Sequence, residues 1–306
     1  MPGNLIVGVR MGGAALRHAE AIVARLRNTT PTTLLLIPIG LSDSDFFHRP
    51  RTTAPLVDAL LARRIDVAVI PVPELAATLP AEVTIAAYPP GRERREAVVY
   101  RADLAVKHLQ PQMTIATPSA LTQAQLAERT PHLRFAPLSE PAGRLRALDD
   151  GRADAAVLPL DELTFLEGLD RAHEAASIEK LVPAIGQGLL ALLCRANDHE
   201  TLALLRPLRD AATALLAGAE RTVLRELESE RSLPLGVLAR IEGDELVLLG
   251  ALASLDGLRV FRGEARGRPD EPEAVGLRLA DEFVRRGARV LLSEVLEETR
   301  LGPFKK

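Results

Sequence analysis

The alternation of short apolar runs with segments of helical periodicity constrains the fold of this chain most strongly. Residues 5–9, 33–39 and 66–70 are apolar runs of strand length. The intervening residues 14–27 and 56–63 repeat their apolar side chains every three or four positions, as one face of a helix does. This alternation is typical of parallel strands joined by helices, so the sequence predicts an α/β fold for its first part.

A second block of the same kind follows Pro89-Pro90-Gly91 and a run of charged residues. We interpret Arg92, Arg94 and Arg95 in that run as a solvated linker face. The block's predicted strands are 97–99, 114–117, 133–137 and 155–158, and its predicted helices are 118–129, capped by Ser119, and 144–150.

The pattern of predicted strands and helices changes in the last part of the chain. After a helical pattern over 199–228, three runs predict antiparallel strands, namely 236–241, 245–253 and 259–263. Glu242-Gly243-Asp244 predicts the turn between the first two, and a helix is predicted over 271–286. The sequence therefore predicts a small α+β domain after two α/β domains.

Composition excludes several classes of function. The 306 residues carry 41 acidic and 38 basic side chains, with seven phenylalanines, two tyrosines and no tryptophan, so neither a basic surface nor a base-stacking platform is expected and nucleic acid is excluded as a partner. The six histidines lack metal-ligand spacing, and no metal is expected. No leader and no apolar stretch of about 20 residues is evident, which predicts a cytoplasmic protein without a membrane partner.

Several motifs occur in the order found in one enzyme family. The segments are LIVGVRMGGAALRHAEAI, ALLARRIDVAV, TPSALTQAQL, GRLRALDDGRADAAVLPLDEL, LVPAIGQGLLALLCRANDHE and AERTVLRELE, followed by SLPLG and ASLDG. Together they resemble hydroxymethylbilane synthase, also called porphobilinogen deaminase, over about 280 residues. The most specific match lies around IGQG, at 185–188.

The resemblance implies a fold and a reaction. It implies two doubly wound domains like those of type II periplasmic binding proteins and a small α+β domain. We expect domain 1 at 1–90 and 188–208, domain 2 at 91–187, and domain 3 at 209–306. The implied reaction joins four porphobilinogen units, each losing ammonia, on a dipyrromethane primer held by a cysteine thioether.

The family's primer cysteine aligns with Arg231 in this chain. A guanidinium cannot form a thioether, because the bond needs a soft sulfur nucleophile. The only cysteine, Cys194, lies in a strand-like apolar run and is interpreted as a buried packing residue. We therefore expect no cofactor in this chain.

The carboxylate that the family places under the pyrrole nitrogens aligns with Glu74. Glutamate keeps the negative charge but adds one methylene, and displacement of about 1 Å can cost roughly 100-fold in rate. Pro71 and Pro73 replace the neighbouring serine and lysine of the family motif. Glu74 is thus the candidate catalytic residue, with a solvated loop position as the alternative.

Arginines are expected to bind the acetate and propionate groups of the pyrroles. Arg10 and Arg144 stand at two family positions and are the candidate substrate-binding residues, together with Gln187 in IGQG, for which a purely structural turn is the alternative. At the family's other arginine positions this chain has Leu121-Thr122 and Leu138.

The substitutions coincide with the catalytic positions, whereas the packing motifs persist. We expect a family member that has lost the standard activity, keeps an anion-binding cleft between its domains, and binds a small anionic ligand such as a pyrrole or another carboxylate, as a monomer. Whether it is an enzyme stays open. One alternative is an active synthase with a non-covalent or atypical primer, and another is a small-molecule sensor or binding module.

Overall fold

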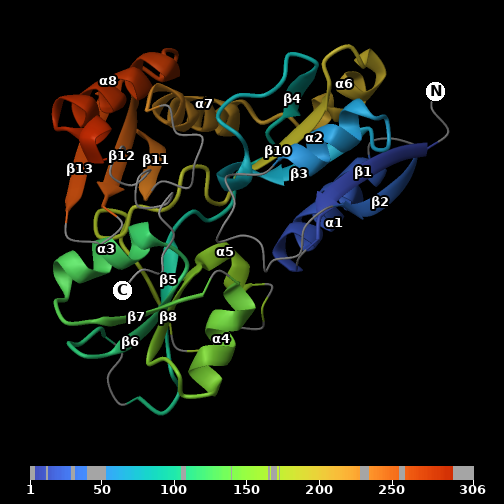
Figure 1. Ribbon diagram of the computed structural model, residues 1–306. Helices are drawn as coiled ribbons and strands as arrows, with labels where there is room; N and C mark the ends of the chain where they lie inside the picture. Colours follow the sequence, from blue (N-terminus) through green and yellow to red (C-terminus); the bar gives the residue numbers. More distant parts are fainter. Residues whose placement is uncertain are drawn as a thin grey trace. The chain divides into compact units, whose positions relative to one another are not determined.

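In the computed structural model (Figure 1), the chain divides into two compact units. The described residues are 4–11, 13–28, 32–39, 53–104, 108–138, 140–164, 166, 171, 173–227, 234–254 and 259–291. The first unit comprises 1–93 and 186–217, and the second unit comprises 94–185 and 218–306. The predicted α/β class with a smaller C-terminal sheet is confirmed.

The first unit is built on a five-stranded sheet in the order β2-β1-β3-β10-β4. Its strands are β1 (Asn4–Arg10), β2 (Thr33–Ile39), β3 (Val67–Pro71), β4 (Val83–Ala87) and β10 (Leu190–Arg195). Its helical elements are α1 (Gly13–Arg27), α2 (Ala54–Leu61), η2 (Val72–Glu74), α6 (His199–Leu205) and η3 (Arg206–Leu208). Strand β1 runs parallel to β2 and β3, whereas β10 runs antiparallel to β3 and β4.

Both faces of this sheet are packed, which explains the nearly continuous apolar runs of its strands. Alternate residues Leu5, Val7 and Val9 of β1 pack in one core with the apolar stripe of α1, which includes Ile22 and Leu26. Residues of α2 and of β3 form a second core. The same two cores contain β10 side chains, so a strand from late in the chain completes a sheet that the N-terminus begins.

The second unit contains a sheet of matching topology, in the order β7-β6-β8-β5-β9. Its strands are β5 (Glu96–Tyr100), β6 (Thr114–Thr117), β7 (Arg134–Pro137), β8 (Ala155–Pro159) and β9 (His173–Ala175), and its helices are α3 (Ala120–Arg129), α4 (Pro141–Asp149) and α5 (Leu160–Leu163). Here too, three parallel strands are followed by an antiparallel one, β5. Ser119 caps α3 by accepting a hydrogen bond from the Thr122 amide, as predicted.

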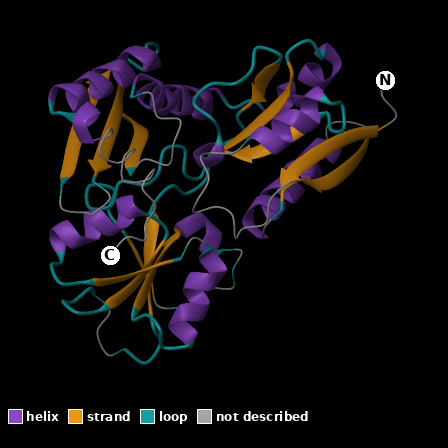
Figure 2. Cartoon of the chain, in the orientation of Figure 1, coloured by secondary structure: helices purple, strands orange, loops and turns teal. Residues whose placement is uncertain are grey.

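The C-terminal part of the second unit is a three-stranded antiparallel sheet with α8 (Pro272–Arg285) against it (Figure 2). Its strands are β11 (Leu235–Glu242), β12 (Glu245–Ala253) and β13 (Val260–Gly267), in that order. Gly243 turns β11 into β12 with a φ of +59°, a left-handed conformation that favours glycine. Helix α7 (Ala211–Glu226) passes from the first unit into the second.

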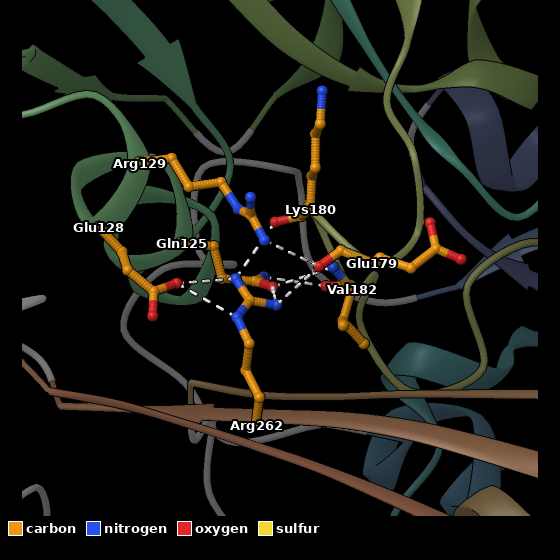
Figure 3. Close-up of polar contacts among 7 residues, drawn as sticks. All are labelled: Gln125, Glu128, Arg129, Glu179, Lys180, Val182 and Arg262. Carbon is orange, nitrogen blue, oxygen red and sulfur yellow. Dashed lines mark hydrogen bonds and ion pairs between the residues drawn. The ribbon is translucent and has the colours of Figure 1, made fainter.

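Polar side chains bind the C-terminal sheet to α3 (Figure 3). Arg262 of β13 donates to the Glu128 carboxylate at 2.9 Å and to the carbonyl of Glu179 at 3.2 Å. Gln125, fully buried on α3, exchanges hydrogen bonds of 3.0 and 2.9 Å with the backbone of Val182. These contacts hold the sheet, the helix and the segment between them as one packed part of the second unit.

Three strands of the structure were not predicted or were predicted only in part. Strand β9 has three residues and little apolar pattern, β4 is an apolar run of five residues that was not predicted as a strand, and β10 was predicted only as a strand-like run. Among the helices in the described ranges, none is long and apolar enough to cross a membrane.

Candidate functional site

Arg10 and Glu74 lie at the same edge of the first sheet. Arg10 ends β1, and Glu74 ends the 3₁₀ helix η2 that directly follows β3. Strands β1 and β3 are parallel neighbours, with Val9 opposite Val69, so their carboxyl ends meet. Open α/β sheets bind ligands outside the carboxyl ends of their strands, which makes this edge the candidate site.

The two side chains form a bidentate ion pair. Arg10 Nε donates to Glu74 Oε2 at 2.9 Å, and Arg10 Nη2 donates to Glu74 Oε1 at 3.0 Å. The remaining terminal nitrogen, Nη1, donates to the carbonyl of Met11 at 3.2 Å. The side chains are 21% and 14% exposed, so the pair is accessible to water but mostly covered. Two parallel N–H···O bonds are the geometry in which a guanidinium binds a carboxylate most specifically.

The turn that carries Glu74 is rigid. Pro71 and Pro73 restrict its backbone dihedrals, and the Val72 amide donates to the Leu189 carbonyl at 3.0 Å. Gly186 packs against the same turn, because a Cβ there would lie 2.2 Å from Val72 Cγ1. The glutamate therefore projects from a fixed backbone, and the predicted solvated loop position does not describe it.

Gln187 lies in the segment that abuts this turn. It is 7% exposed and is flanked by Gly186 and Gly188, whose φ angles are +74° and +73°. The Gly188 carbonyl accepts a hydrogen bond of 3.0 Å from the Arg92 amide. The glycines explain the conformation of IGQG as a tight turn, and the binding role of Gln187 stays a prediction.

Arg144 belongs to the second unit, whereas Arg10, Glu74 and Gln187 belong to the first. It lies on α4, is 1% exposed, and donates through Nη1 to the Leu138 carbonyl at 2.7 Å. Burial lowers the pKa of Arg144 to about 10, against the charges of Glu96 and Glu162, which raise it. The guanidinium therefore stays protonated at neutral pH with the protein's own acids around it. Its role in substrate binding stays a prediction.

The chain's only thiol belongs to the core of the first unit. Cys194 is fully buried in β10, and burial raises the pKa of its thiol to about 11, with the charge of Asp198 acting in the same direction. This confirms its predicted packing role. Arg231 lies outside the described residues.

Leu121 and Thr122, where the resemblance to the family led us to expect paired arginines, are each 4% exposed at the start of α3. Leu121 packs in an apolar cluster with Ala251 and Ala253 of β12. A Cβ at Gly236, at the start of β11, would lie 2.9 Å from Leu121 Cδ2. Leu121 therefore serves packing between α3 and the C-terminal sheet.

Sequence reasoning missed the buried ion pair of Arg94 with Glu220. Arg94 is 12% exposed and Glu220 is fully buried, so the predicted solvated linker face is wrong for Arg94. A glutamate at an inward position of α7 was the available signal. In the part of the chain that the structure describes, no group of three or more histidine, cysteine or acidic side chains could hold a metal ion.

Two α/β sheets of matching strand order, each with one antiparallel strand, and an appended antiparallel sheet define a mixed α/β protein with an additional small α+β part. Comparison with known families is more specific. Residues 46–203 match the model "Porphobilinogen deaminase, dipyromethane cofactor binding domain", and residues 214–285 match "Porphobilinogen deaminase, C-terminal domain". The chain belongs to the porphobilinogen deaminase family.

Individual relatives of this chain support the same family assignment. The porphobilinogen deaminase of Roseiflexus sp. (strain RS-1) is 34% identical over 304 residues, covering 96% of this chain and all of the relative. That of Acidithiobacillus ferrooxidans (strain ATCC 53993 / BNL-5-31) is 33% identical over 310 residues, covering 98% and 99%. A solved ancestral cationic amino acid solute binding protein has a TM-score of 0.43 and 14% identity over 67% of this chain and 87% of its own, which adds nothing to the assignment.

These matches correct the expectation about cofactors. The family model over 46–203 is that of a dipyrromethane cofactor-binding domain, so the expectation that no cofactor belongs to this chain is wrong at the level of its family. A thioether to that group needs an accessible thiol of ordinary or lowered pKa. Cys194 is inaccessible and has a raised pKa, so it does not fit a thioether-linked dipyrromethane.

Proposed function

We propose that this chain acts in tetrapyrrole biosynthesis as a family member that has lost the standard condensation of porphobilinogen on a thioether-linked primer and has kept a carboxylate-binding site. The burial of Cys194 carries the proposal, because it is the only thiol in the sequence and it lies within a central strand. Exposing it would require opening the first sheet.

The residues at the positions where the family has arginines support the same proposal. The growing product of the family's reaction gains two carboxylates with each porphobilinogen. Each of these carboxylates needs a cationic partner. Leu121 and Thr122 offer no charge and are buried, and Arg10 is bound to Glu74. A hydrogen bond to a charged group contributes about 1.5–3 kcal/mol, so each missing arginine lowers product affinity by roughly tenfold or more.

Mass spectrometry of the denatured protein after incubation with porphobilinogen tests the proposal. We expect the mass of the unmodified chain and no hydroxymethylbilane above the level of a Glu74→Ala variant. An Arg231→Cys variant is the matched positive control for the aligned thiol position. A covalent increment of two pyrrole units on the unaltered chain, or turnover that Glu74→Ala abolishes, would overturn the proposal.

The second candidate is an active synthase that binds its dipyrromethane without a thioether. It is favoured by one observation, the match of 46–203 to the cofactor-binding domain model. Native and denaturing mass spectra distinguish the candidates, since a non-covalent dipyrromethane adds mass only to the native protein. Turnover that survives Cys194→Ala would favour this candidate over any thioether at that residue.

The ligand proposed for the retained site is small and anionic, a pyrrole carboxylate or another carboxylate. We also propose a monomer located in the cytoplasm. A sensor or binding module remains the alternative reading of the same site, and a thermal-shift series with anionic metabolites tests it, because a module of this kind is stabilised by its ligand.

A further inference from the structure

Arg10, the candidate anion-binding residue of the first unit, is already bound to a carboxylate of the protein itself, that of Glu74. Arg10 presents its Nε and Nη2 donors to both oxygens of Glu74, at 2.9 and 3.0 Å. This is the arrangement that a guanidinium offers to a carboxylate ligand, at the sheet edge where such ligands bind. We propose that Glu74 is a built-in competitor that occupies the carboxylate site of Arg10, so that a ligand carboxylate binds there only by displacing it.

The inference deepens the proposed function, because it concerns the regulation of the carboxylate site retained there. The turn before Glu74 makes the competitor effective. Pro71 and Pro73 limit the backbone, and Val72 is bound to Leu189 and covered by Gly186. A tethered group on a fixed backbone has already lost most of the freedom that a free ligand must lose on binding, so it competes at a high effective concentration.

The exposure of the pair allows displacement. With 21% of the Arg10 side chain and 14% of the Glu74 side chain exposed, the ion pair is reachable from solvent. Moving the glutamate side chain outward would free two donors of Arg10, while the backbone hydrogen bond from Val72 to Leu189 does not involve that side chain. The site therefore takes carboxylates of a ligand that compensates for this displacement with further contacts, and it rejects simple carboxylates.

Isothermal titration calorimetry with succinate, a dicarboxylate that cannot condense, tests the proposal on the full chain. Glu74→Gln keeps the size of the side chain and removes its charge, so we expect it to bind succinate about tenfold or more tightly than the unaltered protein. The double variant Arg10→Met/Glu74→Gln should lose this gain. Glu82→Gln, the same charge change at an exposed residue of the first unit, should bind as the unaltered protein does.

The proposal is overturned if Glu74→Gln binds succinate no more tightly, if Glu82→Gln gains as much, or if the gain persists without Arg10. Circular dichroism establishes that each variant is folded. Should Glu74→Gln be unfolded, Glu74→Asp replaces it, because one methylene less withdraws the carboxylate by about 1.5 Å and leaves the charge. It should then show a smaller gain, and the absence of any gain would contradict the proposal. Succinate binding is measured without turnover or covalent loading, so this result stands apart from the test of lost condensation.

Discussion

Arg94 and Glu220 form a buried ion pair with a closest nitrogen–oxygen distance of 2.6 Å. Glu220 also accepts a hydrogen bond of 2.7 Å from the Ala239 amide, and Arg94 donates to the Ala239 carbonyl at 3.2 Å. Arg94 is the first residue of the second unit after the chain leaves the first, and Ala239 is in β11. The pair therefore connects the first residue of the second unit to the C-terminal sheet.

Removing the charge of Glu220 should destabilise the protein strongly. Breaking a buried ion pair by removing one partner costs about 3–5 kcal/mol, because the other charge stays desolvated. We expect a loss of about 3 kcal/mol for Glu220→Gln in the free energy of unfolding, measured by urea denaturation. Asp103→Asn removes an exposed partner of Arg101 and should change it by less than about 1 kcal/mol. Equal effects would contradict the assigned burial.

Gly186→Ala should disrupt the turn that carries Glu74. The added Cβ would lie 2.2 Å from Val72 Cγ1 and 2.6 Å from Val72 Cβ, and the φ of +74° is unfavourable for alanine. Gly243→Ala is the matched control, with a φ of +59° and nothing within 4 Å of its Cβ. We expect a loss of about 1–2 kcal/mol for the control and a clearly larger loss for Gly186→Ala in thermal or urea unfolding.

The thiol of Cys194 should resist alkylation in the folded protein. Burial raises its pKa from 9.0 to about 11, which lowers the thiolate fraction at pH 8 roughly a hundredfold, and the side chain is inaccessible. Mass spectrometry after iodoacetamide treatment should detect little labelling in buffer and complete labelling in guanidinium chloride. Labelling at the same rate in both would show that β10 does not bury the residue.

His18 should make stability depend on pH between about 4 and 6.5. Burial, helped by the charge of Arg92, lowers the pKa of His18 to about 4, so the unfolded chain binds a proton in this range that the folded protein does not. Stability therefore falls as the pH decreases from 6.5 to 4, by at most about 3 kcal/mol from this residue. Urea titrations at several pH values should show a shallower slope for His18→Gln. An unchanged slope would contradict the shift.

Much of the fold could be predicted from sequence because strong apolar periodicity and local turn signals coincide. Strand β12 has the predicted bounds, and Ser119 caps α3 as its position indicated. Strand β9 escaped because its three residues, His-Glu-Ala, carry too little apolar pattern. Strand β4 is apolar, but among the described strands it pairs only with β10, which lies about a hundred residues later in the sequence.

The candidate site was predicted only in part. Family motifs identified Arg10 and Glu74 as candidates, yet their mutual ion pair joins residues 64 positions apart and depends on the parallel register of β1 and β3. The burial of Arg94 depends likewise on Glu220 and Ala239, which come more than 120 residues later. Charge patterning along a sequence cannot distinguish a solvated arginine from one whose partner is so distant.

The position of β10 between β3 and β4 has a consequence for synthesis on the ribosome. A nascent chain that ends before Leu190 contains both neighbours of this strand but nothing to join them, so β3 presents an unpaired edge while about a hundred further residues are translated. The sheet of residues 94–185 has all five of its strands by then and can fold first. The N-terminal sheet is thus begun first and completed later, and its open edge needs protection from aggregation during translation.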